Sequence, residues 1–191
     1  MSALKTPCVT LKLATSLDGK IALANGASRW ITGPESREEV HRLRASHEAI
    51  LTGIGTILAD DPQMTARPEG GSETQPDVIV MDSKSRIPRD AKIFVEESRQ
   101  VFARRDGNLT EGIRKYSTVL IEAGSQIVAS AIKADLVDRI EWFRAPIVLG
   151  GDGLSVMSEL DLEALDEAPK FKRVAMTERG DDIQESYERV R

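Results

Sequence analysis

The sequence contains one cysteine, Cys8, and two histidines, His41 and His47. A single cysteine excludes an internal disulfide and any cysteine-rich metal site. The histidines are six positions apart, so they do not share a helical face as an i, i+4 zinc-binding pair would. We therefore expect no metal site, and we expect both histidines to be surface or packing residues.

Long apolar runs are also missing. The N-terminal residues form no signal-peptide core, and no apolar stretch approaches the ~20 residues that span a membrane. Basic residues are dispersed and the formal net charge is −5, which argues against a general nucleic-acid binder. These absences predict a cytoplasmic protein with neither a membrane nor a nucleic acid as partner.

Two catalytic motifs are absent as well. No G-x-S-x-G occurs, and neither histidine follows an acid in a triad order, which excludes a typical serine hydrolase. Gly53-Ile-Gly55 and Gly150-Gly151-Asp152-Gly153 each follow an apolar run. Neither completes the G-x-G-x-x-G pattern, so a Rossmann dinucleotide site is unsupported.

What is present indicates an α/β fold. Apolar content of 40% and charged content of 30% are ordinary for a globular protein, and we expect residues 1–191 to form one domain. Alternating or continuous apolar runs predict strands at 9–14, 49–53, 77–82, 100–104, 117–122 and 139–145. Helical signals are found at Gly33-Pro34 and over 55–60, 109–116 and 125–134.

The expected sheet is mixed and mostly parallel, with helices on its flanks. Alternation around 174–176 and over 183–190 predicts an antiparallel hairpin at its C-terminal edge. Residues 67–76 are rich in Pro, Gly, Ser and Glu, which is typical of a mobile loop.

The stretch from Ser28 to Arg67 concentrates groups that bind anions and hydroxyls. Arg44 and Arg67 are candidate phosphate ligands because a guanidinium is a planar, bidentate donor. Either arginine alone is more often a solvated surface residue. Their grouping with Ser28, Trp30, Thr56 and Asp60 predicts half of a pocket for an anionic, polyhydroxylated small molecule.

A second candidate region begins at Glu122. A carboxylate at the end of an apolar run must be paired, exposed or functional, since burying it alone is costly. Ala123, Gly124 and Ser125 then lead into a helix, whose N-terminal N–H groups and dipole favour a phosphate. The alternative is a strand–helix connection in which Gly124 serves only the geometry of the turn.

Ordered blocks of this sequence resemble the reductase domain of riboflavin biosynthesis, the C-terminal domain of a bifunctional deaminase/reductase. They include LKLATSLDGK at 11–20 and SRWIT at 28–32, and the others lie at 41–45, 49–52, 56–62, 65–67, 80–83, 121–124, 136–138 and 145–151. The likeness covers nearly the whole chain. It implies a dihydrofolate-reductase-like fold, NADPH as hydride donor, and a homodimer. The implied reaction reduces the ribosyl group of 5-amino-6-(5-phosphoribosylamino)uracil to a ribityl chain.

The resemblance also assigns roles to individual residues. The family's substrate contacts fall on Ser28, Arg44, Met64, Arg67 and Glu122. Its cofactor contacts fall on Ala14, Trp30, Thr56, Asp60, Ser83, Gly124, Ser125, Gln126 and Ser130. Asp60 and Glu122 are the candidate catalytic residues, which would orient hydroxyls or assist proton transfer. The sequence does not choose between these two.

The chain departs from the family pattern at three points. Glu122-Ala123-Gly124 stands where the family has Glu-Gly-Gly, and residues 102–118 leave room for one helix only. Neither H-x-E nor P-C-x-x-C of a zinc deaminase domain occurs, so we expect a stand-alone reductase or an isolated domain.

Other functions stay open beside the leading one. The chain could reduce the diaminopyrimidinone analogue of the substrate, or it could be a catalytically silent relative that binds a nucleotide or acts as a dimeric interaction module. Dihydrofolate reduction lacks support because the ligand-contacting residues follow the riboflavin pattern.

Overall fold

The computed structural model describes residues 7–191, which divide into two compact units. The first unit comprises residues 7–9 and Glu38–Gly124, and the second comprises Thr10–Arg37 and Ser125–Arg191. The assignment of residues 1–191 to one domain stays a prediction.

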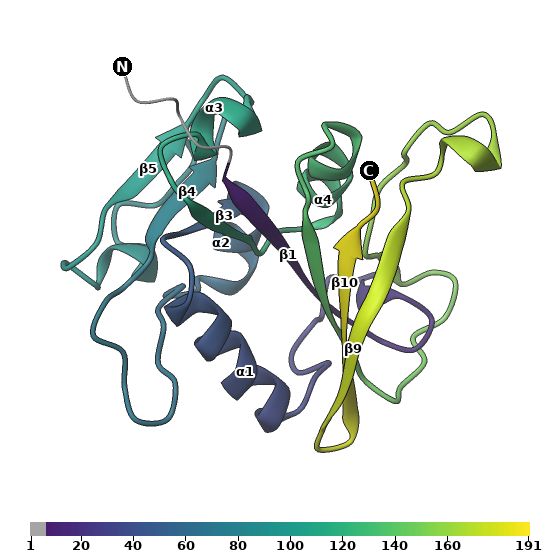
Figure 1. Cartoon of the computed structure of the whole chain (residues 1–191). Helices are drawn as coiled ribbons and strands as arrows, with labels where there is room; N and C mark the ends of the chain where they lie inside the picture. Colours follow the sequence, from purple (N-terminus) through teal and green to yellow (C-terminus); the bar gives the residue numbers. More distant parts are fainter. Residues whose placement is uncertain (1–6) are drawn as a thin grey trace. The chain divides into compact units, whose positions relative to one another are not determined.

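The first unit contains four parallel strands in the order β5-β4-β3-β6. All five residues of β3 are buried, which explains its continuous apolar sequence, because a strand covered on both faces has no solvent side. Figure 1 shows β3 and β4 side by side. The strands are β3 (Ala49–Gly53), β4 (Asp77–Met81), β5 (Val101–Arg104) and β6 (Thr118–Ile121), and the helical elements are α2 (Ile54–Asp60), η1 (Lys92–Phe94) and α3 (Leu109–Ile113).

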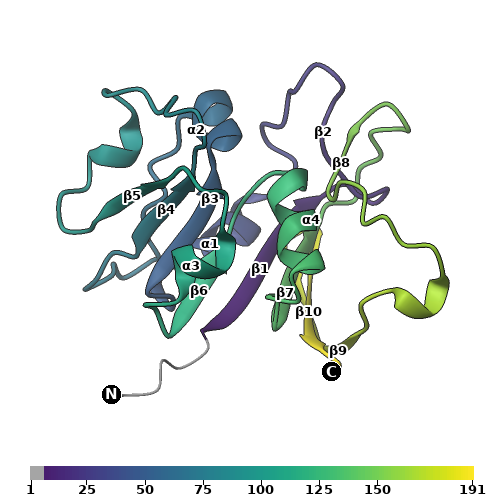
Figure 2. The ribbon, with the colours of Figure 1, turned by 90° about the horizontal axis from the view of Figure 1, so that it is seen from above.

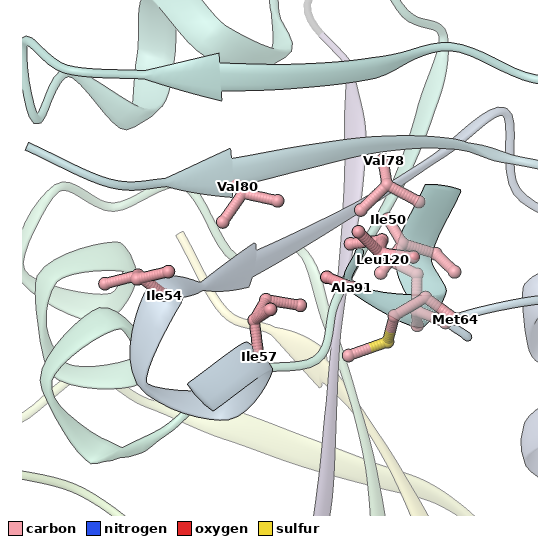
Figure 3. Close-up of a cluster of buried hydrophobic side chains, with 9 residues drawn as sticks. Ile50, Ile54, Ile57, Met64, Val78, Val80, Ala91 and Leu120 are labelled. Atoms are coloured by element: carbon pink, nitrogen blue, oxygen red, sulfur yellow. The ribbon is translucent and has the colours of Figure 1, made fainter. Parts of the chain in front are cut away.

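The core of the first unit is a cluster of nine buried apolar side chains. Figure 3 shows that Ile54 and Ile57 of α2 lie over the sheet residues, and that Met64 reaches the same cluster from a segment without helix or strand. Burial of each large side chain contributes about 1.5–3 kcal/mol. The cluster consists of Ile50, Ile54, Ile57, Met64, Val78, Val80, Ala91, Ile93 and Leu120.

The second unit has a mixed sheet in the order β1-β7-β10-β9. β1 and β7 are parallel, and β10 is antiparallel to both β7 and β9. The β9–β10 hairpin is the yellow part of Figure 1, and the short antiparallel pair β2–β8 is visible in Figure 2. The elements are β1 (Cys8–Thr15), β2 (Lys20–Ala22), α4 (Ser125–Lys133), β7 (Arg139–Arg144), β8 (Leu154–Ser155), η2 (Leu165–Glu167), β9 (Phe171–Arg179) and β10 (Asp182–Arg189).

Helix α1 (Pro34–Ala45) begins in the second unit and continues in the first. Pro34 suits the first helical position because its φ is already helical. The buried carboxylate of Asp182 accepts hydrogen bonds from Gly33 N (2.7 Å) and Ser36 Oγ (2.6 Å). The first residue of β10 thus supplies the acidic group that a helix N-terminus favours.

The sequence-based expectation of a mixed, mostly parallel sheet with an antiparallel C-terminal hairpin is confirmed. Residues 102–118 hold one helix, α3, which ends at Ile113 rather than at residue 116 as predicted. Gly112, a poor helix former, stands near that end. Within residues 7–191, none of the helices has the length and apolar character needed to cross a membrane.

Candidate functional site

The carboxyl ends of the parallel strands in the first unit meet at one edge of the sheet. Gly53 pairs with Met81, and Leu51 pairs with Ile121. The residues that follow these strands therefore lie along the same edge, which is where open α/β sheets hold their ligands. The predicted site residues placed there are Thr56 and Asp60 on α2, Ser83 after β4, and Glu122 and Gly124 after β6.

Arg44 and Glu122 form a buried, bidentate ion pair. Arg44 Nε donates to Glu122 Oε1 (2.7 Å) and Arg44 Nη2 donates to Glu122 Oε2 (2.9 Å). The two side chains are 14% and 6% exposed. Burial alone would lower the pKa of Arg44, but the charge and hydrogen bonds of Glu122 outweigh it and raise that pKa. Arg44 is therefore held charged, and the two side chains fix each other's orientation.

Residues 63–67 form a segment without regular secondary structure, referred to below as the 63–67 segment. Side chains from other parts of the first unit hydrogen-bond to its main chain. Arg99, buried, donates to Met64 O (2.5 Å), to Ile93 O (3.0 Å) and to Gln63 O. Arg44 Nη1 donates to Thr65 O (3.2 Å). Two guanidinium groups thus replace the partners that a helix or sheet would give these carbonyls.

The rest of the segment is held in the same way. The Gln75 side chain accepts from Ala66 N and donates to Ala66 O, both at 2.8 Å. His41 Nδ1 lies 3.1 Å from Thr65 O and 3.2 Å from Arg67 N. Burial, and then the charges of Arg44 and Arg67, lower the pKa of His41. The segment is therefore preorganised although it contains no ladder hydrogen bonds.

The side chain of Arg67 is set by this segment. Its Nη1 donates to Thr65 Oγ1 (2.6 Å) and to Gln63 Oε1, and the residue is exposed. A guanidinium that is oriented by neutral acceptors keeps its full charge for an anion in solvent. This geometry suits a phosphate ligand.

Met64 differs from the other predicted substrate contacts. It has a left-handed main chain with φ 52°, and its side chain is 3% exposed within the core cluster shown in Figure 3. Its sulfur lies 3.9 Å from Arg44 Nη2. Met64 is thus a packing residue of the core cluster, and its contact with a substrate stays a prediction.

The adjacent carboxylates at the end of α2 have different surroundings. Asp61 adopts φ 42° at the C-cap of α2, and it accepts from Lys92 N (2.9 Å) and pairs with Lys92 Nζ (3.2 Å). Asp60 is the half-buried last residue of α2. Asp61 thus belongs to the turn, while Asp60 stays the candidate for contact with a ligand.

In the second unit, the predicted contact Trp30 lies on the surface. The residue is 71% exposed, and the guanidinium of Arg37 lies 4.6 Å from the ring centroid. The Arg29–Trp30 peptide bond is cis. A surface pocket of about 320 Å³ beside Trp30 is lined also by Gly33, Arg37 and Ile147. Ser28 is half-buried before α1, and Ala14 is half-buried in β1.

Helix α4 carries three of the predicted cofactor residues, Ser125 and Gln126 at its N-terminus and Ser130 further along. Ser158 donates from its N–H to Ser125 O (3.2 Å) and from its Oγ to Ser125 Oγ (3.1 Å). Ser130 Oγ donates to Gln126 O (2.8 Å). Because the first N–H groups of a helix have no intrahelical acceptor, the start of α4 can bind a phosphate. At Gly124, which ends the first unit, a Cβ atom would meet nothing within 4 Å.

The structure brings Arg44, Met64, Arg67 and Glu122 together in the first unit. The sequence did not identify Thr65, Gln75 or Arg99, and His41 was expected to be a surface or packing residue. Its position three residues before Arg44 on one helix is the only sequence signal for its location. Within residues 7–191, no cluster of His, Cys, Asp and Glu is suited to hold a metal ion.

Comparison with known proteins identifies the family. The family model described as "RibD C-terminal domain" matches residues 7–184. Riboflavin biosynthesis protein RibD of Haemophilus influenzae is 32% identical over 216 residues, which cover 95% of this chain and 58% of that protein. The Mycobacterium tuberculosis RibD is 34% identical over 180 residues, covering 93% of this chain and 53% of the relative. The chain spans little more than half the length of these curated relatives.

Solved structures support the same family and fold. The Acinetobacter baumannii RibD structure in its first form aligns with a TM-score of 0.89 at 28% identity, covering 97% of this chain and 59% of that one. A dihydrofolate reductase from Enterococcus faecalis aligns with a TM-score of 0.64 at 16% identity, which supports the predicted dihydrofolate-reductase-like fold. The chain therefore belongs to the RibD C-terminal domain family.

Proposed function

We propose that this chain catalyses the NADPH-dependent reduction of 5-amino-6-(5-phosphoribosylamino)uracil, converting its ribosyl group to a ribityl chain. The observation that carries the proposal is the charged cluster in the first unit. In this cluster Arg44 bonds to Glu122 and to Thr65 O, and the neighbouring Arg67 has its guanidinium oriented by Thr65. A Thermotoga maritima protein named as a deaminase/5-amino-6-(5-phosphoribosylamino)uracil reductase supports it, with a TM-score of 0.82 at 28% identity.

The two arginines have different roles in this proposal. Arg67 holds the substrate phosphate, because its exposed guanidinium is oriented by neutral groups alone. The N–H groups of Arg44 are engaged by Glu122 and Thr65 O. Arg44 therefore orients Glu122, whose carboxylate accepts hydrogen bonds from substrate hydroxyl or N–H groups. Ser28 remains a proposed substrate contact in the second unit.

The residues proposed to hold NADPH fit such a group. Exposed Trp30 offers a ring face for stacking, and the start of α4 at Ser125 and Gln126 offers main-chain N–H donors for a phosphate. Ser130, further along α4, belongs to the same set of proposed contacts. Gly124 leaves space for close approach of a ligand to the main chain. NADPH, when bound, would supply the hydride, while the protein supplies position and charge. Ala14, Thr56, Asp60 and Ser83 complete the proposed contacts.

Asp60 and Glu122 differ as candidate catalytic groups. Glu122 is bonded twice by Arg44, so it orients substrate groups rather than donating a proton. Asp60 is the candidate to assist proton transfer from the end of α2. A homodimer is also proposed, on the family resemblance alone, and light scattering of the purified chain tests it. A cytoplasmic location is proposed from the sequence, which predicts neither a signal peptide nor a membrane span.

Binding of nicotinamide nucleotides tests the proposal first. NADPH and NADH are titrated into the chain while nucleotide fluorescence is followed, and micromolar binding of NADPH is expected. Failure of both nucleotides to bind would support a catalytically silent relative. Turnover is then measured with 5-amino-6-(5-phosphoribosylamino)uracil and with its diaminopyrimidinone analogue, and faster reduction of the analogue would replace the proposed substrate.

Replacement of Arg67 tests the proposed binding of the substrate phosphate. Loss of a charged hydrogen bond costs about 1.5–3 kcal/mol, so Arg67→Ala should raise KM for the pyrimidine about ten- to hundredfold and leave KM for NADPH unchanged. Arg89→Ala is the matched control, since Arg89 is an exposed arginine in a turn of the same unit. A pyrimidine KM equal to that of the control would remove Arg67 from the site.

A further inference from the structure

We infer that His41 is a positioning residue of the substrate half of the site: its neutral ring accepts the main-chain N–H of Arg67 through Nδ1 and thereby fixes where Arg67 presents its guanidinium. The functional part of this inference rests on the proposed function, because it concerns how the substrate phosphate is held. The structural part concerns the ring alone and does not depend on any reaction.

The geometry around Nδ1 presents two alternatives. Nδ1 lies 3.2 Å from Arg67 N and 3.1 Å from Thr65 O. An unprotonated Nδ1 accepts from Arg67 N–H, whereas a protonated Nδ1 donates to Thr65 O, so one ring cannot make both bonds at once. The tautomer therefore decides which of the two residues His41 holds.

Other partners in the segment favour the acceptor form. Thr65 O already receives Arg44 Nη1 at 3.2 Å, so it keeps a donor when His41 does not donate to it. The Arg67 main-chain N–H donates to His41 Nδ1, which can accept only while it is unprotonated. The Nε2–H tautomer therefore satisfies both groups, because Thr65 O keeps Arg44 as its donor.

The surroundings of the ring also favour its neutral form. Burial of the ring is the largest cause of the lowered pKa of His41, followed by the charges of Arg44 from the same helix and Arg67 from the 63–67 segment. The Thr65 carbonyl and the charge of Glu122, which follows β6, act in the opposite direction. Because Arg44 and Glu122 form a bidentate ion pair, their charges largely compensate each other at the ring.

Protonation would then have a defined consequence. A charged ring turns its Nδ1–H to Thr65 O, leaves the Arg67 N–H, and loosens the main chain that carries the guanidinium. Affinity for the pyrimidine phosphate should fall as pH drops through the titration of His41, and affinity for NADPH should not follow it.

Nuclear magnetic resonance tests the ring directly. The sequence contains two histidines, so long-range ¹H–¹⁵N spectra of the full chain should show two rings, assigned with His41→Asn and His47→Asn. We expect His41 at pH 7 as the Nε2–H tautomer, titrating below the ordinary value of about 6.5. A ring that carries its proton on Nδ1, or that is charged at pH 7, would overturn the inference whether or not the chain has reductase activity.

Two substitutions test the positioning role. Asparagine places Oδ1 near the position of Nδ1, so His41→Asn keeps the acceptor without a titration, whereas His41→Leu removes it. His41→Leu should raise the pyrimidine KM about tenfold with kcat and the NADPH KM unchanged, and His41→Asn should restore it and abolish its rise at low pH. A wild-type KM in His41→Leu, or an equal loss in both variants, refutes the role.

The wild-type, His41→Leu and His41→Asn proteins can also be compared by ligand binding alone. If neither pyrimidine is reduced, the dissociation constant of ribose 5-phosphate is measured for the three proteins by its effect on the spectra. Weaker binding in His41→Leu than in His41→Asn supports the positioning role, while equal binding in all three refutes it. Far-UV circular dichroism confirms that the variants fold, and His47→Asn is the matched control.

Discussion

Replacing Arg44 with methionine should lower the free energy of unfolding by about 3–5 kcal/mol at neutral pH. The change removes both hydrogen bonds that Arg44 makes to the carboxylate of Glu122, whose side chain is 6% exposed. A buried charge that loses its partner has this cost because neither water nor a counter-charge replaces the lost interaction. For a chain of this size each kcal/mol corresponds to about 2–4 °C in Tm, so Tm should fall by about 6–20 °C.

Urea unfolding, followed by circular dichroism and tryptophan fluorescence, measures the change, with coincident transitions as the check on two-state behaviour. The double variant Arg44→Met/Glu122→Leu should recover most of the loss, because both charges leave the interior together.

Arg42→Met is the matched control for this experiment. Arg42 lies on the same helix, its side chain is 48% exposed, and it pairs with Glu38 and Glu39 at 3.2 Å. An exposed pair of this kind contributes less than about 1 kcal/mol. If Arg44→Met cost no more than Arg42→Met, or if the double variant were as unstable as the single one, the description of Arg44–Glu122 as a desolvated pair would be wrong.

Three further predictions concern stability. Burial, followed by the 2.8 Å hydrogen bond to Asp77, raises the pKa of Tyr116 in the folded protein. Since the pKa of an unfolded tyrosine is about 10, the free energy of unfolding should fall as pH rises above that value. Tyr116→Phe should remove this pH dependence in urea titrations at alkaline pH. Hydrogen bonds from the Ser16 hydroxyl and the loop at 149–150 lower the pKa of Asp18 from 3.8 to about 2, so its stabilising contribution is present above the higher value and lost on acidification toward the lower. Asp18→Asn should flatten that acid-unfolding slope, and an unchanged slope would contradict the assignment. A Cβ at Gly153 would lie 3.2 Å from two main-chain oxygens, whereas one at Gly151 would meet nothing within 4 Å. Thermal unfolding should therefore show that Gly153→Ala lowers the free energy of unfolding by about 1–3 kcal/mol and that Gly151→Ala changes it little.

Local patterns predicted most of the fold. The run at 77–82 is apolar because its strand is buried between neighbours on both sides, and such a run leaves few alternatives to a strand. Leu154–Ser155 was missed because a two-residue strand shows no period. It forms only because β2 lies antiparallel to it.

The site was predictable only in part. The guanidinium of Arg44 suggested an anion, but its observed partner, Glu122, is 78 residues away and is brought near by the pairing of β3 with β6. Arg99 follows two glutamates and a serine, which is typical of a solvated surface residue. Its burial depends on the carbonyls of the 63–67 segment, and no local pattern encodes where those carbonyls point.

The division of the chain affects the order in which its parts can be completed during synthesis. The first unit has all of its residues by Gly124, whereas the second combines Thr10–Arg37 with Ser125–Arg191. The hydrogen bonds between β1 and β7 therefore have to wait until the intervening residues have been made. Pairing across so long a separation is slow because the loop must close before contacts form. A released fragment that ends near residue 124 should therefore protect β3 and β4 from hydrogen exchange, whereas protection of β7 and β10 should require the longer chain.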